Sequence, residues 1–366
     1  MAALNIVSVV GWVVLSTMVG AQIIHAMNPD IPPWASILVI AISTLVIALI
    51  GHRAVHVYEC YTLVPCLIVF LVVLGQYARS GHFADVVTLT NGRERVVAAL
   101  SFASALYGAG SGWCVFAADY TVYQPVHRSQ ASIYLWVFGC LYAPICFLEL
   151  LGAAVATGIL QDDGYLEAYG DGGVGGLLAH VLLPELGGFG AFCLVILMLS
   201  TIGNNAPVVY SIAFSLQALA RRTQRVPRFI RSLGCTAVYV GISIAGYDSF
   251  AEWLANFVVI FGYWIGIYQA IALIEHLLFR RGTEGYRPDD YTNPEALPPG
   301  YTLLGAACFG VVGIVLGMSQ DWYTGVVARV LGTAGRGADV GLLLGFGFGG
   351  VSYAVLRVVE RLHFKR

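Results

Sequence analysis

The sequence has 366 residues, of which 58% are hydrophobic and only 11% are charged, and its mean hydropathy is +0.78. A soluble domain has about 25% charged residues, so an ordinary water-soluble fold is excluded. Disorder needs high charge and low hydrophobicity and is excluded more firmly, while the net charge of −2 provides no basic surface for nucleic acid.

Ten apolar segments follow one another along the chain, at about the length that a membrane-spanning helix needs. Such segments must be helical, because backbone polar groups find no water in hydrocarbon, and the alternating pattern of a membrane barrel is absent. We therefore expect an all-α polytopic bundle forming one transmembrane domain, residues 1–366, with loops in the polar stretches 77–95, 158–187 and 279–299. The segments are 3–25, 33–51, 60–76, 96–118, 131–157, 188–219, 230–247, 251–278, 300–318 and 338–357.

The Lys and Arg residues indicate the orientation of the chain, because cytoplasmic loops carry an excess of them. If both termini are cytoplasmic, the inner loops and the C-terminal tail hold 14 basic residues and the outer loops hold 5. The acidic 158–187 stretch then faces outside. We expect a multi-pass protein of the plasma membrane with both termini in the cytoplasm.

The segment 96–118 contains three glycines at alternate positions, Gly108, Gly110 and Gly112, followed by Trp113. Each glycine weakens a helix by up to ~1 kcal/mol relative to alanine, so we expect a helix break that frees backbone groups for a ligand. Unwound backbone within a membrane survives only where it is buried in protein or lines a cavity. The alternative is close helix packing on small residues, with Trp113 as an interfacial anchor.

The segment 188–219 contains a second predicted break. Pro207 has no N–H, so the carbonyl of Gly203 loses its usual helical donor. The adjacent amides of Asn204 and Asn205 offer donors and acceptors that suit the edge of a heterocycle. The alternative is a proline kink at which the asparagine side chains satisfy the freed backbone groups.

The first segment places Trp12 and Ser16 four residues apart, and therefore on one face of a helix. An aromatic plane beside a hydroxyl suits a flat ligand. The alternative is a packed indole and a serine that hydrogen-bonds to its own helix.

Four residues are candidates for binding a cation or carrying a proton. Ser200 and Thr201 provide hydroxyls one turn before the paired asparagines. Asp119 and Glu149 are carboxylates in apolar surroundings, where such groups are costly and mark functional sites by default. The alternatives are a helix cap at the cytoplasmic surface for Asp119, and a structural hydrogen bond to a neighbouring helix for Glu149.

Other patterns in the sequence do not indicate catalysis. Residues 345–350 fit G-x-G-x-x-G but lie in an apolar segment with no strand before it, so we interpret Gly345 and Gly349 as a packing face. His52 and His56 have helical spacing but no third ligand nearby. We therefore expect no metal, no cofactor and no enzyme activity.

Several blocks, in order over nearly the whole chain, resemble the purine–cytosine permeases, a fungal and bacterial branch of the nucleobase–cation symporters. Each block alone is weak, and together they are specific. The blocks are Gly11–Trp12, Val19–Gln22, Gly112–Trp113, Ala117–Tyr123 with Pro125, Phe147–Ala154, Asn204–Pro207, Val226–Arg228, Asn256–Phe257, Gly262–Trp264 and Glu275–His276.

The resemblance implies twelve spans in a LeuT-like architecture, with two inverted five-helix repeats and two further helices. The ten segments then match spans three to twelve, so that 96–118 is the sixth span and 188–219 is the eighth. The first two spans, which help to form the substrate and cation sites, are missing from this match. We therefore expect either a chain that has been cut short or a remnant that does not transport by itself.

The resemblance also implies which residues contact the substrate. Trp12 and Trp113 match the third-span and sixth-span tryptophans, and Asn204 matches a functional asparagine of the eighth span. Ser16 stands where fungal members often carry asparagine, and Val208 stands where another polar contact is expected. These two departures put the family's substrate choice in doubt for this chain.

The combined reading predicts a secondary active transporter that carries a purine or cytosine nucleobase by proton symport. The expected partners are the nucleobase, a co-transported proton or sodium ion, and the lipid bilayer, with no nucleic acid. The expected substrate contacts are Trp12, Ser16, Gly112, Trp113, Asn204 and Asn205. The alternatives are a transporter of a related ring compound, of the pyridoxine, nucleoside or allantoin type, and a non-transporting truncated membrane protein.

Overall fold

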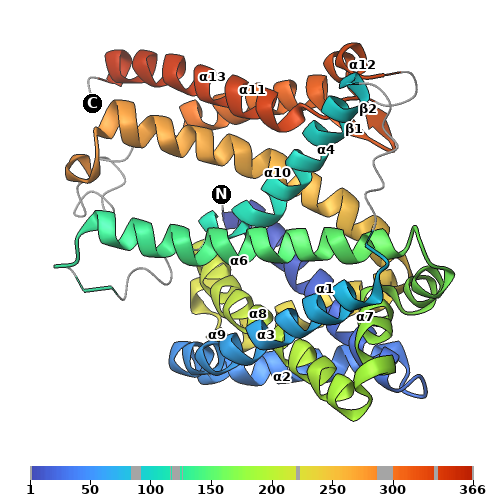
Figure 1. The fold of residues 1–366 in the computed structure, drawn as a ribbon. Helices are drawn as coiled ribbons and strands as arrows, with labels where there is room; N and C mark the ends of the chain where they lie inside the picture. The colour runs from blue at the N-terminus through green and yellow to red at the C-terminus, as the bar shows by residue number, and fades with distance from the viewer. Residues whose placement is uncertain are drawn as a thin grey trace. The chain divides into compact units, whose positions relative to one another are not determined.

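The computed structural model describes residues 2–83, 92–115, 117, 124–125, 127–219, 223–286, 300–333 and 337–364. Nearly all of these residues are helical, as Figure 1 shows. The strands found among them are β1 (Ser319–Gln320) and β2 (Tyr323–Thr324), which pair antiparallel in a short hairpin. The predicted all-α bundle is therefore confirmed.

The chain forms two compact units. The first unit comprises Met1–Val86 and Val115–Leu254, and the second comprises Val87–Cys114 and Ala255–Arg366. The first contains α1 (Ala2–Met27), α2 (Pro33–Ile50), α3 (His52–Ser80), α6 (Gln130–Gly158), α7 (Asp163–Leu186), α8 (Gly188–Leu219), η2 (Thr223–Arg225), α9 (Arg228–Gly246) and η3 (Tyr247–Ser249). The second contains α4 (Gly92–Ser111), most of α10 (Phe250–Ile274), η4 (Glu275–Arg280), η5 (Thr283–Gly285), α11 (Tyr301–Gly317), α12 (Val326–Leu331) and α13 (Gly341–Phe364), and η1 (Gly112–Val115) lies at the boundary.

Each of the ten predicted apolar segments is helical over most of the residues that the structure describes. Within the described ranges, eight stretches are long and apolar enough to cross a membrane. The number is lower than ten because α9, α10 and η4 form one continuous stretch, Arg228–Arg280, and because α11, at 17 residues, is just short of the length required.

The helix α7 corrects the expectation of a loop over 158–187. Asp162 caps its N-terminus, where Oδ1 accepts hydrogen bonds from the backbone N–H groups of Gly164 at 2.6 Å and Tyr165 at 3.4 Å. The helix kinks at Gly173, which has a positive φ of 58°. Gln22 of α1 holds this kink by accepting a hydrogen bond from Val174 N at 3.1 Å. The glycines and acidic residues of this stretch are typical of a loop. The helix could not be predicted from them, because it is stabilised by contacts with α1.

The core of the first unit is the contact of α1 and α8, which pack against each other and against α2 and α9. Apolar residues such as Val13, Met18, Leu194 and Ile212 are fully buried there. The helices approach closely at Gly20, because a Cβ atom on this residue would lie 2.5 Å from Thr201 Oγ1. This contact fixes the faces of α1 and α8 that carry the polar residues described below.

The second unit packs its helices on glycines. A Cβ on Gly313 of α11 would lie 2.6 Å from the carbonyl oxygen of Leu344, and one on Gly345 of α13 would lie 2.7 Å from Ile314 Cγ1. A Cβ on Gly349 would lie 3.2 Å from Ile267 Cγ2. The interpretation of Gly345 and Gly349 as a packing face is therefore confirmed.

Candidate functional site

The helices α1 and α8 bring Ser16 and Asn204 together near the middle of both helices. Asn204 Nδ2 donates a hydrogen bond of 3.4 Å to Ser16 Oγ, and the Asn204 side chain is exposed. Trp12 lies one turn before Ser16 on α1 and is half-buried. We call Ser16–Asn204 the open pair, because its amide is accessible to a ligand.

The neighbouring residues form a second pair across the same two helices. Asn205 Nδ2 donates a hydrogen bond of 3.1 Å to Thr17 Oγ1, and both residues are 0% exposed. Asn205 Oδ1 has no hydrogen-bond partner among the described residues. We call Thr17–Asn205 the buried pair, and a substrate contact with Asn205 would require α1 and α8 to separate.

Thr17 and a further polar contact between the same helices were not predicted from the sequence. Asn5 Nδ2 donates to Ser215 Oγ at 2.8 Å, near the beginning of α1 and the end of α8. The spacing of Asn5, Trp12 and Ser16 on one face of α1 is a signal that could have indicated a polar stripe. Its partner helix could not be inferred from spacing alone.

The helix α8 continues through Pro207 without interruption, so the unwinding expected there is not present. Asn204 and Asn205 bond to hydroxyls of α1 rather than to freed backbone groups of their own helix. A packed membrane helix tolerates proline because its neighbours and local adjustments compensate for the missing donor. The carbonyl of Gly203 still has no N–H to accept from residue 207.

The end of α4 contains the other predicted break. Gly108 and Gly110 lie within α4, and the α-helix gives way to a 3₁₀ turn at Gly112, which is buried. Trp113 lies in this turn and is half-buried. The helical pattern therefore changes at Gly112, four residues later than the first glycine.

Packing accounts for Gly108, as the alternative reading proposed. A Cβ on Gly108 would lie 2.1 Å from the carbonyl oxygen of Val258 in α10, and one on Gly262 would lie 3.1 Å from Gly108 Cα. A Cβ on Gly110, by contrast, would meet nothing within 4 Å.

The coupling candidates differ in their surroundings. Ser200 Oγ donates to Leu197 O and Thr201 Oγ1 donates to Met198 O, each at 2.7 Å, so both hydroxyl protons are used within α8. Thr201 is buried, and its Oγ1 lies at the close contact with Gly20 of α1. Glu149 is half-buried in α6. Asp119 lies outside the described residues.

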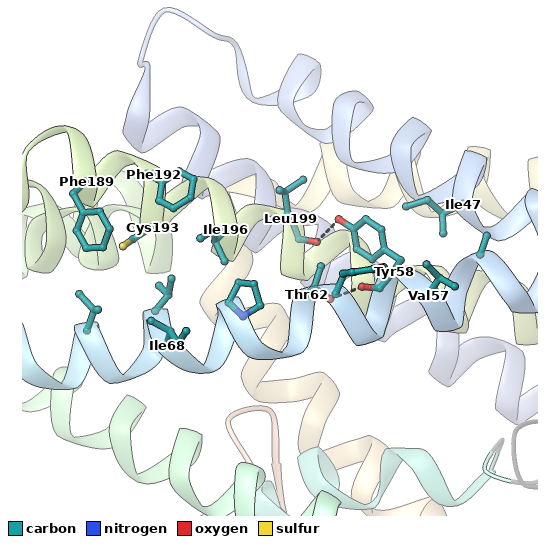
Figure 2. A pocket seen from close by; sticks show the side chains of 15 residues that line it. Ile47, Val57, Tyr58, Thr62, Ile68, Phe189, Phe192, Cys193, Ile196 and Leu199 are labelled. Carbon is teal, nitrogen blue, oxygen red and sulfur yellow. Dashed lines mark hydrogen bonds between the residues drawn. The ribbon is translucent and has the colours of Figure 1, made fainter.

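A groove of about 840 Å³ runs between α3 and α8 in the first unit, and Figure 2 shows its lining. Its walls are apolar, with Phe189, Phe192 and Ile196 of α8 facing α3. The Tyr58 hydroxyl donates its proton to Leu199 O at 2.9 Å, so it has no proton left to donate to a ligand. None of the predicted site residues lines this groove, and its walls are unsuited to the polar edge of a heterocycle.

Charged residues gather at the end of α10 in the second unit. Glu275 accepts hydrogen bonds from Arg280 Nε at 3.0 Å, Arg357 Nε at 3.2 Å and the Tyr353 hydroxyl at 3.0 Å. Arg357 also pairs with Glu360 at 2.6 Å. We call these residues the Glu275 cluster; it joins η4 to α13.

Comparison with known proteins identifies relatives over the whole chain. The family model described as "Permease for cytosine/purines, uracil, thiamine, allantoin" matches residues 1–338. The chain is 45% identical to the purine-cytosine permease fcyB of Emericella nidulans over 366 residues, which is 100% of this chain and 71% of that protein. It is 36% identical to the purine-cytosine permease FCY2 of Saccharomyces cerevisiae over 368 residues, covering 99% of this chain and 68% of that protein.

A more distant relative is named for a different substrate. The vitamin B6 transporter TPN1 of Saccharomyces cerevisiae is 28% identical over 415 residues, covering 100% of this chain and 71% of that protein. No solved structure matches the chain. The extent of the family match and the identities above 30% lead to one conclusion: this multi-pass membrane protein belongs to the family of permeases for cytosine and purines, uracil, thiamine and allantoin.

Proposed function

We propose that the chain is a secondary active transporter that moves a purine or cytosine nucleobase across the plasma membrane together with a proton. Family membership and the names of the relatives support transport rather than catalysis. The observation that carries the proposal is the open pair, an accessible carboxamide bonded to a hydroxyl near the middle of two membrane helices.

The chemistry of the open pair suits a nucleobase, which is flat and neutral and has donors and acceptors on its edge. Asn204 presents both kinds of group without a charge, so it can bind a neutral ring with little desolvation cost. The indole of Trp12 lies one turn away on α1 and would stack on the ring face, a contact worth about 1–3 kcal/mol per base by analogy with single-strand binding.

Trp113, in the second unit, remains a proposed stacking residue on the basis of the resemblance, with Gly112 beside it. Coupling is assigned to a proton, with Asp119 and Glu149 as candidate carriers and with Ser200 and Thr201 as ligands if the ion is sodium. Alternating access would come from the rocking of one group of helices against another. The proposal includes termini on the cytoplasmic side, in keeping with the distribution of basic residues.

A related ring compound such as pyridoxine is the second candidate substrate, since a vitamin B6 transporter is among the relatives. The higher identity to purine-cytosine permeases favours the nucleobase.

The test is uptake of labelled cytosine by cells that lack their own nucleobase permeases and express this chain. The proposal predicts uptake that adenine inhibits and pyridoxine does not, and that falls when the proton gradient is collapsed. Inhibition by pyridoxine alone would favour the second candidate, and no uptake by a chain shown to reach the membrane would contradict both.

A further inference from the structure

Two adjacent asparagines of α8 have opposite environments. The amide of Asn204 is exposed, whereas that of Asn205 is 0% exposed, although both donate to consecutive hydroxyl residues of α1. The two pairs therefore divide one interface into an outer contact that a ligand can reach and an inner contact that it cannot.

Stability alone does not explain the buried pair. Asn205 lies among the buried apolar residues Ile202, Ala206 and Val209, and its Oδ1 has no partner in the part of the chain that the structure describes. An unpaired buried polar atom costs free energy, and a leucine of similar volume would avoid that cost. Buried polar groups of this kind can instead fix the register of packed helices.

The backbone of α8 lacks one helical hydrogen bond near the two asparagines, so a contact with another helix can stabilise its position there. Pro207 removes the hydrogen bond that the carbonyl of Gly203 would otherwise accept. Proline is the usual place where a helix bends, and Asn204 lies between these two residues. The hydrogen bond that the structure shows for the Asn204 amide goes to another helix, to Ser16 of α1.

We propose that Thr17 and Asn205 are positioning residues, whose hydrogen bond sets the rotation of α8 against α1 and so directs Asn204 toward the ligand. The expected effect on transport rests on the proposed function, whereas the positioning of α8 against α1 does not. The buried pair acts through Asn204 and does not itself touch the substrate.

Thr17→Val and Thr17→Ser form the matched test, because valine keeps the shape of threonine and removes the hydroxyl, while serine keeps the hydroxyl. Thr17→Val is expected to raise the KM for cytosine uptake roughly tenfold, because a misplaced Asn204 would lose its hydrogen bond to the substrate. The maximal rate is expected to stay within about twofold. Thr17→Ser is expected to keep the wild-type KM. A double variant of Thr17→Val and Asn205→Leu is expected to match Thr17→Val alone, because both remove the same contact.

A second readout does not depend on transport. Asn204→Cys places a thiol at the open pair, and its alkylation rate, followed by peptide mass spectrometry in membranes, reports how position 204 faces. Adding Thr17→Val is expected to change that rate at least about threefold and adding Thr17→Ser to leave it unchanged, since only the valine variant loses the buried hydrogen bond. Equal rates in both would overturn the inference. Absence of cytosine uptake in the wild type would instead remove the proposed function, while the alkylation rates would still decide the role of the buried pair.

Discussion

The α1–α8 interface of the first unit and the α10–α13 contact of the second unit use different polar chemistry. Near the middle of α1 and α8, neutral amides bond to hydroxyls in the open pair and the buried pair. At the end of α10, the Glu275 cluster joins ionised groups. Ionised groups are expensive in hydrocarbon unless they are paired. The comparison indicates that ion pairs tie η4 to α13 in the second unit, whereas the polar contacts near the middle of α1 and α8 are neutral and suit a neutral ring.

The largest effect is expected from breaking the Glu275 cluster. Glu275→Ala leaves the Arg357 guanidinium, which is 7% exposed, without one of its two carboxylates. Removing one partner of a buried ion pair costs about 3–5 kcal/mol, so the melting temperature of the purified protein should fall strongly. Glu275→Gln keeps the shape and an acceptor and should lose less. A shift of roughly 2–4 °C in melting temperature is expected per kcal/mol in a larger domain. If the wild type and the two variants melt within about 1–2 °C of each other, the cluster does not stabilise the contact between η4 and α13.

The second prediction concerns the proposed stacking face of the first unit. Trp12→Ala should lower the apparent affinity for cytosine by about ten- to a hundredfold, since stacking on an aromatic residue is worth about 1–3 kcal/mol. Trp34→Ala is the control, because Trp34 is exposed at the start of α2. Concentration dependence of uptake measures both. Equal affinity in the two variants would remove Trp12 from the site.

The third prediction separates packing from unwinding at the end of α4. Gly108→Ala should destabilise the protein by about 1–3 kcal/mol, because the added Cβ overpacks the contact with α10 where only 2.1 Å separates it from Val258 O. Gly110→Ala meets open space and should be neutral or stabilise by up to about 1 kcal/mol, as alanine favours the helix. Thermal unfolding of the two variants compares them directly. The opposite order of stability would favour a functional break over packing.

The smallest effect is expected at the hydroxyl of the open pair. Ser16→Ala removes a hydrogen bond of 3.4 Å at an exposed side chain, so cytosine affinity should fall by only about two- to tenfold, the range for one net hydrogen bond. Competition by unlabelled cytosine measures this change. A complete loss of uptake would mean that Ser16, rather than Asn204, makes the principal contact.

The sequence predicted the helices well because apolar runs of membrane length leave the backbone no alternative. It missed α7, whose kink at Gly173 is held by Gln22 of another helix. Close packing at Gly108 was one of the two predictions, but α10 could not be named as the partner, since no pattern along the chain identifies the neighbouring helix. Pro207 signals a missing donor but not whether neighbouring helices compensate for it.

The polar residues of the site show the same limit. Ser16 and Asn204 could be singled out by residue type and position, and the structure brings them together. The residue types of Asn204 and Asn205 do not show which of the two is buried, because their burial is set by the contact of α8 with α1.

Binding of labelled cytosine to the purified full chain tests the central claim most directly, because it isolates the open pair from the coupling step. The account predicts saturable binding that adenine displaces, and a loss of at least about tenfold in affinity for Asn204→Leu, since a lost hydrogen bond and the burial of unpaired groups on the ring edge both act against the variant. Binding of equal affinity in the wild type and in Asn204→Leu, at matched thermal stability, would contradict it.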